Sequence, residues 1–444
     1  MILYNTLTKQ KEQLDKSEIT MYVCGVTVYD RPHLGHALST ITFDVLHRYL
    51  EYIGRKVTRV QNFTDVDDKI IARSKELNIT PKDVAEKYIK AFFEDMDSLG
   101  VRRADVHPRA TEDMKEIIDL IQDLIDKNAA YELNGSVYFN VEFSDDYGKL
   151  SRRNISDLIE GNRIENEPDK KNPGDFALWK HAEECETHWD SPWGKGRPGW
   201  HIECSAMVKK HLGDVIDIHG GGLDLVFPHH ENEIAQSESA SNCKPFAKIW
   251  MHNGLLKRSG DEKMSKSLGN SLDVKDALEK YSGNSIRLWI LQSHYRQPSS
   301  LDDTSLEIAQ KSITRIERTI NLDGNSGFDT KNYKEKFIEA MNDDLGTPKA
   351  IATIFDLVHD INKSNDSSKK INEGIVLLKE LLSVLGFEFL TEIQDDSEII
   401  KLIDKRNQLR VNKEYDKADQ IRNDLLSMGI EILDSKEGTN FRRI

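Results

Sequence analysis

The apolar positions near the start of the chain change their spacing twice. Residues 19–25, ITMYVCG, are an apolar run that ends in glycine, which predicts a buried strand. Residues 34–53 carry apolar side chains at steps of three and four, which predicts a helix that Gly54 ends. Residues 56–63, KVTRVQNF, predict a second strand. A strand, a helix and a strand in this order indicate a βαβ unit and therefore a parallel sheet.

The pattern changes again further along the chain. Two more helices are predicted at 65–78 and 81–99, and a charged segment from about 115 to 195 contains one hairpin-like stretch, NGSVYFNV. Residues 213–225, GDVIDIHGGGLDL, return to a buried strand with a glycine-rich exit. Helical spacing dominates from about residue 300, and residues 400–444 predict one long charged helix followed by a short hairpin.

These patterns predict an α/β fold class. We expect a Rossmann-like parallel-sheet domain with an insertion, followed by a helical bundle and a small mixed α/β C-terminal domain. The predicted parts are 1–115 and 196–250 for the two halves of the sheet domain, 116–195 for the insertion, 251–300 for a polar loop and its surroundings, 301–390 for the bundle and 391–444 for the C-terminal region.

Composition narrows the class of protein. The chain has 444 residues with 38% hydrophobic and 31% charged side chains, and we find no run of about 18 apolar residues and no signal-peptide plan at the start. A cytoplasmic protein without a membrane segment is therefore expected. The four cysteines, Cys24, Cys185, Cys204 and Cys243, are too few for a disulfide framework, so they are either buried thiols or metal ligands.

Charge is unevenly distributed along the chain. The net charge of −15 argues against a protein that coats nucleic acid. Residues 401–444, however, hold ten Lys and Arg against eight Asp and Glu, so the tail is slightly positive. This difference is a weak indication of a polyanionic partner at the C-terminal end.

The stretch FPHHENE, residues 227–233, concentrates candidate ligands. Pro228 suits the first position of a helix, and His229 and Glu233 then lie four apart on one helix face. The zinc-protease pattern is excluded because Ile234 stands where its second histidine would be. By spacing alone, the stretch is either a ligand pair or a solvated, charged first turn.

Two further motifs fit a nucleotide. HLGH, residues 33–36, lies where the first strand passes into the first helix, which is the ligand-binding edge of a parallel sheet. Imidazoles beside a helix start suit a polyphosphate, and Gly35 allows close approach. KMSKS, residues 263–267, offers lysines that could close over a triphosphate. Taken singly, each motif also fits a capped helix start or an exposed basic loop.

Together these motifs carry a resemblance to a known family. H-x-G-H after the first strand and KMSKS far downstream resemble the class I aminoacyl-tRNA synthetases. The likeness is closest to the cysteinyl-tRNA synthetases and spans nearly the whole chain, in YVCGVTVYDRPHLGHA, NFTDVDDKI, GWHIECSAM, DIHGGGLDLVFPHHENEIAQSE, KMSKSLGN and KADQIRNDL…GIEILDSKEGTNFRR. One departure is Phe441, where the family commonly has tryptophan. Phenylalanine is still an aromatic side chain that stacks on a base.

The resemblance implies one Zn²⁺ per chain, held by Cys24, Cys204, His229 and Glu233. Two thiolates and an imidazole suit this ion, and a substrate thiolate could bind it directly. Without the resemblance, plain core positions would be the better interpretation of both cysteines. We expect His219 and His230 to support the site without ligating the metal. Cys185 and Cys243 are expected to be structural thiols.

The remaining site residues also follow from the resemblance. His33, His36, Lys263 and Lys266 would be catalytic, with Mg²⁺ accompanying ATP. Cysteine would contact Gly25, Thr27, Thr64 and Trp200, and ATP would contact Gly35, Gly221, Gly222, Asp224 and Lys266 as well as the two histidines.

The implied activity is ATP-dependent ligation of L-cysteine to tRNA(Cys) through a cysteinyl-adenylate, by an enzyme expected to be a monomer. The segment 251–300 would hold the KMSKS loop and the stem contact, and residues 301–444 would bind tRNA. Two alternatives stay open: a mycothiol-type ligase that joins cysteine to an amino sugar, and a non-catalytic RNA-binding paralogue.

Overall fold

The computed structural model describes residues 1–153, 170–183, 186–258, 272–301, 303–389, 397–412, 414–427, 430–435 and 438–443. The chain divides into two compact units, Met1–Glu388 and Phe389–Ile444. Each unit is described separately below.

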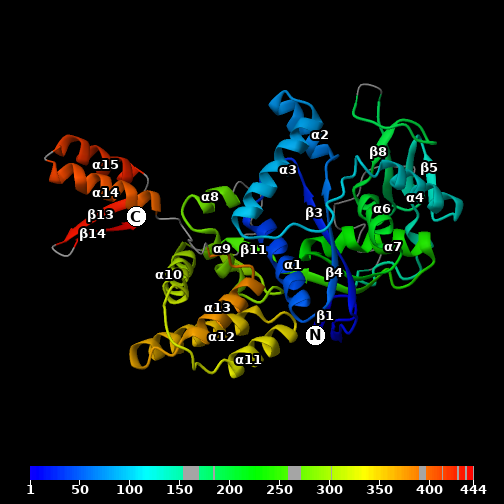
Figure 1. Ribbon diagram of the computed structural model, residues 1–444. Coiled ribbons are helices and arrows are strands. Elements are labelled where there is room, and N and C mark those ends of the chain that lie inside the picture. The colour runs from blue at the N-terminus through cyan, green and yellow to red at the C-terminus, as the bar shows by residue number, and fades with distance from the viewer. Residues whose placement is uncertain are drawn as a thin grey trace. The chain divides into compact units, whose positions relative to one another are not determined.

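A parallel sheet of four strands is the centre of the first unit (Figure 1). Its order is β10-β9-β3-β4, from Ala247–Asn253, Ile216–Gly222, Glu18–Thr27 and Lys56–Thr64. The predicted βαβ unit is confirmed, because helix α1, Leu34–Tyr52, connects the parallel neighbours β3 and β4. The chain adds β4 on one side of β3 and later adds β9 on the other. Ligands of open parallel sheets bind where the strand order reverses in this way, at the carboxyl ends of the strands.

The insertion folds as an antiparallel sheet with the order β5-β6-β7-β8. Its strands are Ala130–Leu133, Ser136–Phe139, Phe176–His181 and Gly196–Pro198. The first two are the predicted hairpin. Helix α4, Met114–Asp126, precedes this sheet, and α6, Trp200–Leu212, follows it and leads into β9.

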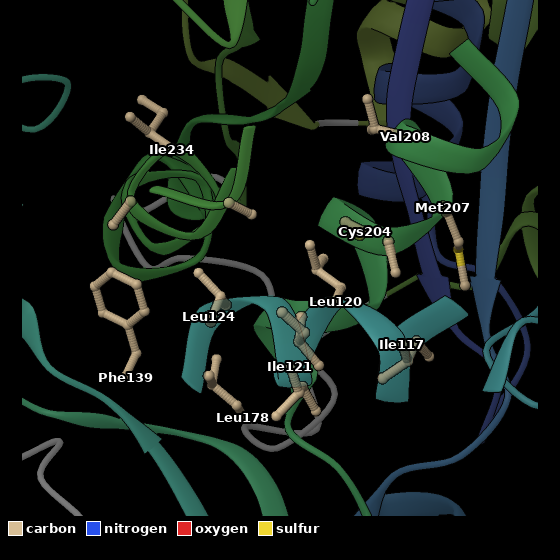
Figure 2. Close-up of a cluster of buried hydrophobic side chains, with 14 of the residues drawn as sticks. Ile117, Leu120, Ile121, Leu124, Phe139, Leu178, Cys204, Met207, Val208 and Ile234 are labelled. Carbon is tan, nitrogen blue, oxygen red and sulfur yellow. The ribbon is translucent and has the colours of Figure 1, made fainter. Parts of the chain in front are cut away.

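One hydrophobic cluster joins the insertion to the central sheet. Figure 2 shows side chains of α4 and α6 converging, with Phe139 of β6 to the left beside Leu124 and Leu178 of β7 below α4. Ile117, Leu120, Ile121 and Leu124 recur at helical spacing on the buried side of α4. Cys204 lies in the same cluster, on α6. Packing in this cluster therefore fixes the position of α6, and with it the position of the Cys204 thiol relative to the sheet.

The stretch FPHHENE differs from the prediction at its start. Residues Val226–His230 form one π-helical turn in which Phe227 is extended, with φ −142° and ψ 131°, and helix α7 begins only at Glu231 and runs to Ser241. A residue before proline is pushed toward extended backbone, so Pro228 cannot follow directly from a helix. The expected helix start at Pro228 was therefore three residues too early.

The remaining elements of the first unit surround the sheet. They include the N-terminal hairpin β1-β2 (Ile2–Asn5, Gln10–Gln13), helices α2 (Asp68–Leu77) and α3 (Pro81–Ser98), and the paired strands β11 and β12 (Leu256–Arg258, Ser299–Leu301). The helical region predicted from about residue 300 contains α10 (Asp303–Ile320), α11 (Lys331–Asn342), α12 (Thr347–Ser367) and α13 (Asn372–Val384). Two further helices, α8 (Val274–Leu278) and α9 (Gly283–Leu291), lie before it.

The second unit has a small core of its own. Helices α14, Ser397–Val411, and α15, Tyr415–Ser427, precede an antiparallel hairpin of β13, Ile430–Ser435, and β14, Gly438–Arg443. The prediction of one long charged helix was wrong. Both helices contribute to a single cluster, made by Ile399, Ile403, Ile421, Leu425, Ile430 and Ile432. A continuous straight helix could not bring its two ends into one core.

Candidate metal centre and nucleotide edge

Four donors from distant parts of the chain meet at the carboxyl end of β3. Cys24 comes from that strand and Cys204 from α6, while His229 and Glu233 come from the π-turn and α7. One ligand atom from each residue lies within 4.8 Å of the others, and all four side chains are buried. The sequence-predicted metal ligands are thus brought together.

The geometry of this cluster fits zinc. The Sγ atoms of Cys24 and Cys204 are 3.7 Å apart. Tetrahedral zinc with Zn–S bonds of about 2.3 Å separates two sulfurs by about 3.8 Å. Glu233 Oε1 lies 3.4 Å from Cys24 Sγ and 3.1 Å from His229 Nε2, which completes a compact set of four. Two sulfurs, one nitrogen and one oxygen are ligand types that zinc accepts.

Burial controls the protonation of the same donors. Burial raises the pKa of the Cys24 thiol well above its usual value, and neighbouring Cys204 and Glu233 add to the shift. Burial also lowers the pKa of His229 to about 3, so this imidazole is neutral at pH 7 and has a lone pair to offer. A divalent cation would stabilise the thiolate forms that burial alone disfavours.

Two other histidines hold the donors in place. His219 Nε2 is 2.8 Å from Glu233 Oε2, and His230 Nε2 is 3.2 Å from Cys24 Sγ. These histidines form a second possible metal set with Cys24 and Glu233. The two sets share the Cys24 thiol and the Glu233 carboxylate. His219 and His230 therefore either support the first set, as we expected, or replace its other two ligands.

A polar chain behind His230 was missed by the sequence analysis. His230 Nδ1 is 2.7 Å from His252 Nε2, and His252 Nδ1 is 2.8 Å from Thr6 Oγ1. His252 lies one residue before the end of β10. The carboxyl ends of parallel strands meet at one edge, so its position in the strand was a usable signal. Thr6 carried no such signal, because its place depends on how the N-terminal segment packs.

The predicted cysteine-contact residues lie beside the metal cluster, at the ends of β3 and β4. Thr27 pairs with Thr64 in the sheet register, and the Gly25 amide donates to Asn62 Oδ1 over 2.8 Å. Gly25 cannot carry a side chain here, because a Cβ atom would lie 1.6 Å from the Asn62 carbonyl oxygen. The close approach of the strands therefore explains this glycine.

Trp200 and Glu203 complete the surroundings of the cluster. Trp200 begins α6, is 39% exposed, and stacks on His229 with ring centres 4.3 Å apart. Glu203 was missed by the sequence analysis. It is buried and accepts a hydrogen bond of 2.9 Å from Thr64 Oγ1. Helical spacing gave no reason to distinguish Glu203 from a solvated acid.

The nucleotide motif caps the first helix. His33 is the N-cap of α1, and its Nδ1 accepts from the His36 amide while His36 Nδ1 accepts from the His33 amide, both over 3.3 Å. The two rings stack with centres 3.7 Å apart. Gly35 lies directly below, since a Cβ atom there would be 2.9 Å from the His33 ring. The motif thus presents two parallel imidazoles at a helix N-terminus.

The exit of β9 provides the other predicted nucleotide contacts. A Cβ atom on Gly221 would lie 2.9 Å from the His230 ring, and one on Gly222 would lie 2.6 Å from Asp224 Oδ1. Neighbouring side chains therefore lie against both glycines, and neither position has room for a side chain of its own.

Lys263 and Lys266 lie outside the described residues. The described chain resumes at Leu272 and runs beside the histidine motif. The Leu34 amide donates to the Leu272 carbonyl over 3.1 Å, and the Val274 amide donates to the Pro32 carbonyl over 3.0 Å. Residues 272–274 are therefore fixed next to the start of α1.

Family comparisons agree with this arrangement. Residues 10–311 match the model of the class I (C) tRNA synthetase catalytic domain, and residues 336–390 match the DALR domain. The fold is similar to that of Mycobacterium tuberculosis methionyl-tRNA synthetase in complex with methionyl-adenylate, with a TM-score of 0.60 at 15% identity over 83% of this chain and 90% of that one. The fold and the edge site thus define a class I tRNA synthetase.

Full-length relatives narrow the class to a family. The chain is 47% identical over 454 residues to a cysteine–tRNA ligase of Dehalococcoides mccartyi, covering 99% of both chains. It is 46% identical to that of Clostridioides difficile over the whole of both chains, and 45% identical to that of Thermococcus gammatolerans over 100% of this chain and 99% of the relative. The chain belongs to the cysteine–tRNA ligase family. Of the three functions predicted from the sequence, cysteine–tRNA ligation is the one confirmed.

A membrane location finds no support in the helices. Among the described residues, no helix combines the length and the apolar character that a membrane span requires.

Proposed function

We propose that Cys24, Cys204, His229 and Glu233 hold one Zn²⁺ that selects cysteine. The sulfur–sulfur distance of 3.7 Å inside a buried four-donor cluster is the observation that carries this proposal. Zinc bound there supplies a soft cation that prefers a thiolate to a hydroxyl. Shape alone distinguishes near-isosteres by only about 1–3 kcal/mol, so a sulfur-seeking site is the stronger basis for rejecting serine.

The surrounding residues orient the substrate. Trp200, stacked on His229, closes one side of the cluster against larger side chains. Glu203 fixes the Thr64 hydroxyl through their hydrogen bond. Gly25 and Thr27, near the end of β3, would contact the substrate amino acid. The cysteine carboxylate would then point along the sheet edge toward the nucleotide.

The nucleotide residues stabilise charge in the first step. The cysteine carboxylate attacks the α-phosphorus of ATP, the bond to the bridging oxygen breaks, and pyrophosphate leaves with its electron pair. His33 and His36, stacked at the N-terminus of α1, would face the phosphates. Lys263 and Lys266 would neutralise the leaving pyrophosphate, with Mg²⁺ bound to ATP. Gly35, Gly221 and Gly222 would admit the nucleotide, and Asp224 would bind ribose hydroxyls.

In the second step a terminal ribose hydroxyl of tRNA(Cys) would attack the carbonyl carbon of the cysteinyl-adenylate. The acyl–phosphate bond breaks, the hydroxyl loses its proton, and AMP leaves. The helices from α10 to α13 and the second unit would bind this tRNA. The match of residues 336–390 to the DALR domain supports this proposal, as does the slightly positive tail. We further propose that the enzyme acts as a monomer in the cytoplasm.

Metal analysis of the purified chain tests the selection site. We expect about one zinc per chain, lost in His229→Ala together with cysteine-dependent ATP–pyrophosphate exchange. Glu233→Gln should lose less zinc and less exchange activity than His229→Ala, because an amide oxygen still coordinates the metal weakly. Cys243→Ala is the matched control and should keep both, since Cys243 lies outside both metal sets.

A spectroscopic measurement separates selection from a merely structural metal. In cobalt-substituted protein, cysteine should add a sulfur–metal charge-transfer band and serine should not. A cobalt spectrum that ignores cysteine, or full-strength cysteine binding by metal-free protein, would overturn the proposal.

A further inference from the structure

A buried ion pair connects the helix of the nucleotide histidines to the helical region. Asp44 lies on α1 and Arg287 on α9, and the carboxylate and guanidinium are bonded with neither side chain exposed. Asp44 is eight residues after His36, about 12 Å along the same helix. Burial alone would raise the pKa of Asp44, but the surrounding guanidinium groups hold it below its usual range.

The guanidinium of Arg287 bonds two further helices. Its Nε donates to the Leu385 carbonyl over 2.6 Å, and its Nη1 donates to the Leu99 carbonyl over 3.0 Å. Leu385 is the C-cap of α13, and Leu99 is the C-cap of α3. Carbonyls at helix ends lack partners within their own helix and carry partial negative charge, so a cation satisfies both. One planar side chain thus holds α1, α3 and α13 together.

Two glycines make room for this contact. Gly386 has φ +73°, and a Cβ atom there would lie 2.0 Å from Arg287 Nη2. Gly283, at the start of α9, would place a Cβ atom 1.9 Å from the Ser98 carbonyl oxygen of α3. The backbones of α3 and α9 therefore approach closely at Gly283, and the Arg287 side chain lies against the chain just after α13 at Gly386.

Stability alone does not account for a pair of this kind. Burying both charges costs desolvation that their attraction only roughly repays, and apolar replacements are often as stable. What a guanidinium adds over apolar side chains is fixed geometry, because its fork bonds several acceptors in one plane. Hydrogen bonds in fixed directions then restrain the angle between α13 and α1. Apolar contacts have no preferred direction and would restrain this angle less.

We propose that Arg287 is a positioning residue for the transfer of cysteine to tRNA. It holds the end of the helical region, at α13, in register with α1, which begins with His33 and His36. The inference rests on the proposed contact between the helical region and tRNA. Cysteine activation needs only the metal cluster and the nucleotide edge, so it should not depend on this register. Transfer requires the end of the tRNA to reach that same edge, so the rate of transfer should depend on this register.

The test compares two reactions of full-length Arg287→Lys. Lysine keeps the charge for Asp44 but cannot also bond the carbonyls of Leu385 and Leu99. We expect ATP–pyrophosphate exchange within about twofold of wild type and a charging kcat lower by about tenfold to a hundredfold at saturating tRNA, as for a small misplacement of reacting groups.

Arg48→Lys is the matched control. Arg48 also bonds Asp44, at 3.0 Å, but its other partner is the Gly100 carbonyl and not α13. Both rates should stay near wild type in this variant. Gly386→Ala is a second, independent disturbance, because its Cβ atom would displace the guanidinium without removing it. It should show the same selective loss of charging.

The outcomes are distinguishable. Exchange and charging that fall together, in step with a lower melting temperature, would reduce Arg287 to a structural role. Normal charging by both Arg287→Lys and Gly386→Ala would also overturn the proposal. Failure of the tRNA contact itself would appear separately, as charging that does not change when the tRNA-binding helices of the otherwise wild-type chain are altered.

Discussion

His107 illustrates how burial sets the charge of one side chain. It lies in the segment between α3 and α4, with Nδ1 2.8 Å from the Gln61 carbonyl oxygen and Nε2 accepting from the Ala104 amide over 3.1 Å. The ring stacks on Phe63. Burial, more than the nearby arginines, lowers its pKa to about 4. A proton on Nε2 would abolish the hydrogen bond that this nitrogen accepts, because the N–H group of the ring would then face the N–H group of Ala104.

This residue predicts acid sensitivity of the first unit. The unfolded chain titrates His107 near 6.5, so between that pH and about 4 the unfolded state binds more protons. The neutral ring contributes its full stabilisation of the folded state above about pH 6.5, and this contribution is lost as the pH falls from about 6.5 to about 4. Urea unfolding at about pH 7 and about pH 5 should show wild type losing roughly 2 kcal/mol more than His107→Asn. Equal losses in the two proteins would contradict this assignment.

At the scale of elements, Asp344 connects three segments that are far apart in sequence. It lies between α11 and α12 in a left-handed conformation, with φ +59°, and is 1% exposed. Its carboxylate accepts from the Tyr4 amide at 2.8 Å, the Tyr295 hydroxyl at 2.7 Å and Arg296 Nε at 2.8 Å. The N-terminal hairpin and the segment after α9 therefore share one buried acceptor.

Removing that acceptor should loosen the hairpin. Asp344→Ala leaves the Tyr4 amide, the buried Tyr295 hydroxyl and the partly exposed Arg296 guanidinium each with one partner fewer. We expect a loss of about 3–5 kcal/mol in the free energy of unfolding, because several hydrogen bonds are lost at once. Asp344→Asn tolerates the left-handed backbone and should cost about 1–3 kcal/mol. The neighbouring Asp343→Asn is the control, since Asp343 is half exposed and pairs with surface lysines. Urea denaturation of the three variants checks the ranking, and equal costs would refute it.

At the scale of the whole molecule, the two units divide the work. The candidate metal cluster and the proposed nucleotide contacts lie before residue 275, while the second unit has its own core of isoleucines and leucine. A unit with a separate core can be removed without opening the first one.

Truncation after Glu388 tests this division. The shortened chain should keep its metal and activate cysteine within about twofold of the full chain, because every donor remains. Charging of tRNA should fall by about a hundredfold or more, because the second unit, which we propose to bind tRNA, is gone. Exchange and charging assays on the same preparation check this, and unimpaired charging would place tRNA recognition elsewhere.

The sequence by itself determined much of this protein. Apolar spacing was enough to predict β3, α1 and β4, because a parallel strand covered on both faces buries consecutive residues, while a helix buries every third and fourth residue. The offset of four between His229 and Glu233 placed them on one side, and the motifs indicated the family before any contact was known. These features depend on neighbours in sequence, which a pattern records directly.

Only the tertiary structure decided the contacts between distant segments. Cys24 and Cys204 are 180 residues apart, yet the order of the sheet and the packing of α6 bring their sulfurs within 3.7 Å. The partners Glu203 of Thr64 and Arg287 of Asp44 could not be predicted for the same reason. A local pattern states which face of an element is buried. Which side chain from another element contacts that face depends on strand order and helix packing, and both depend on the whole chain.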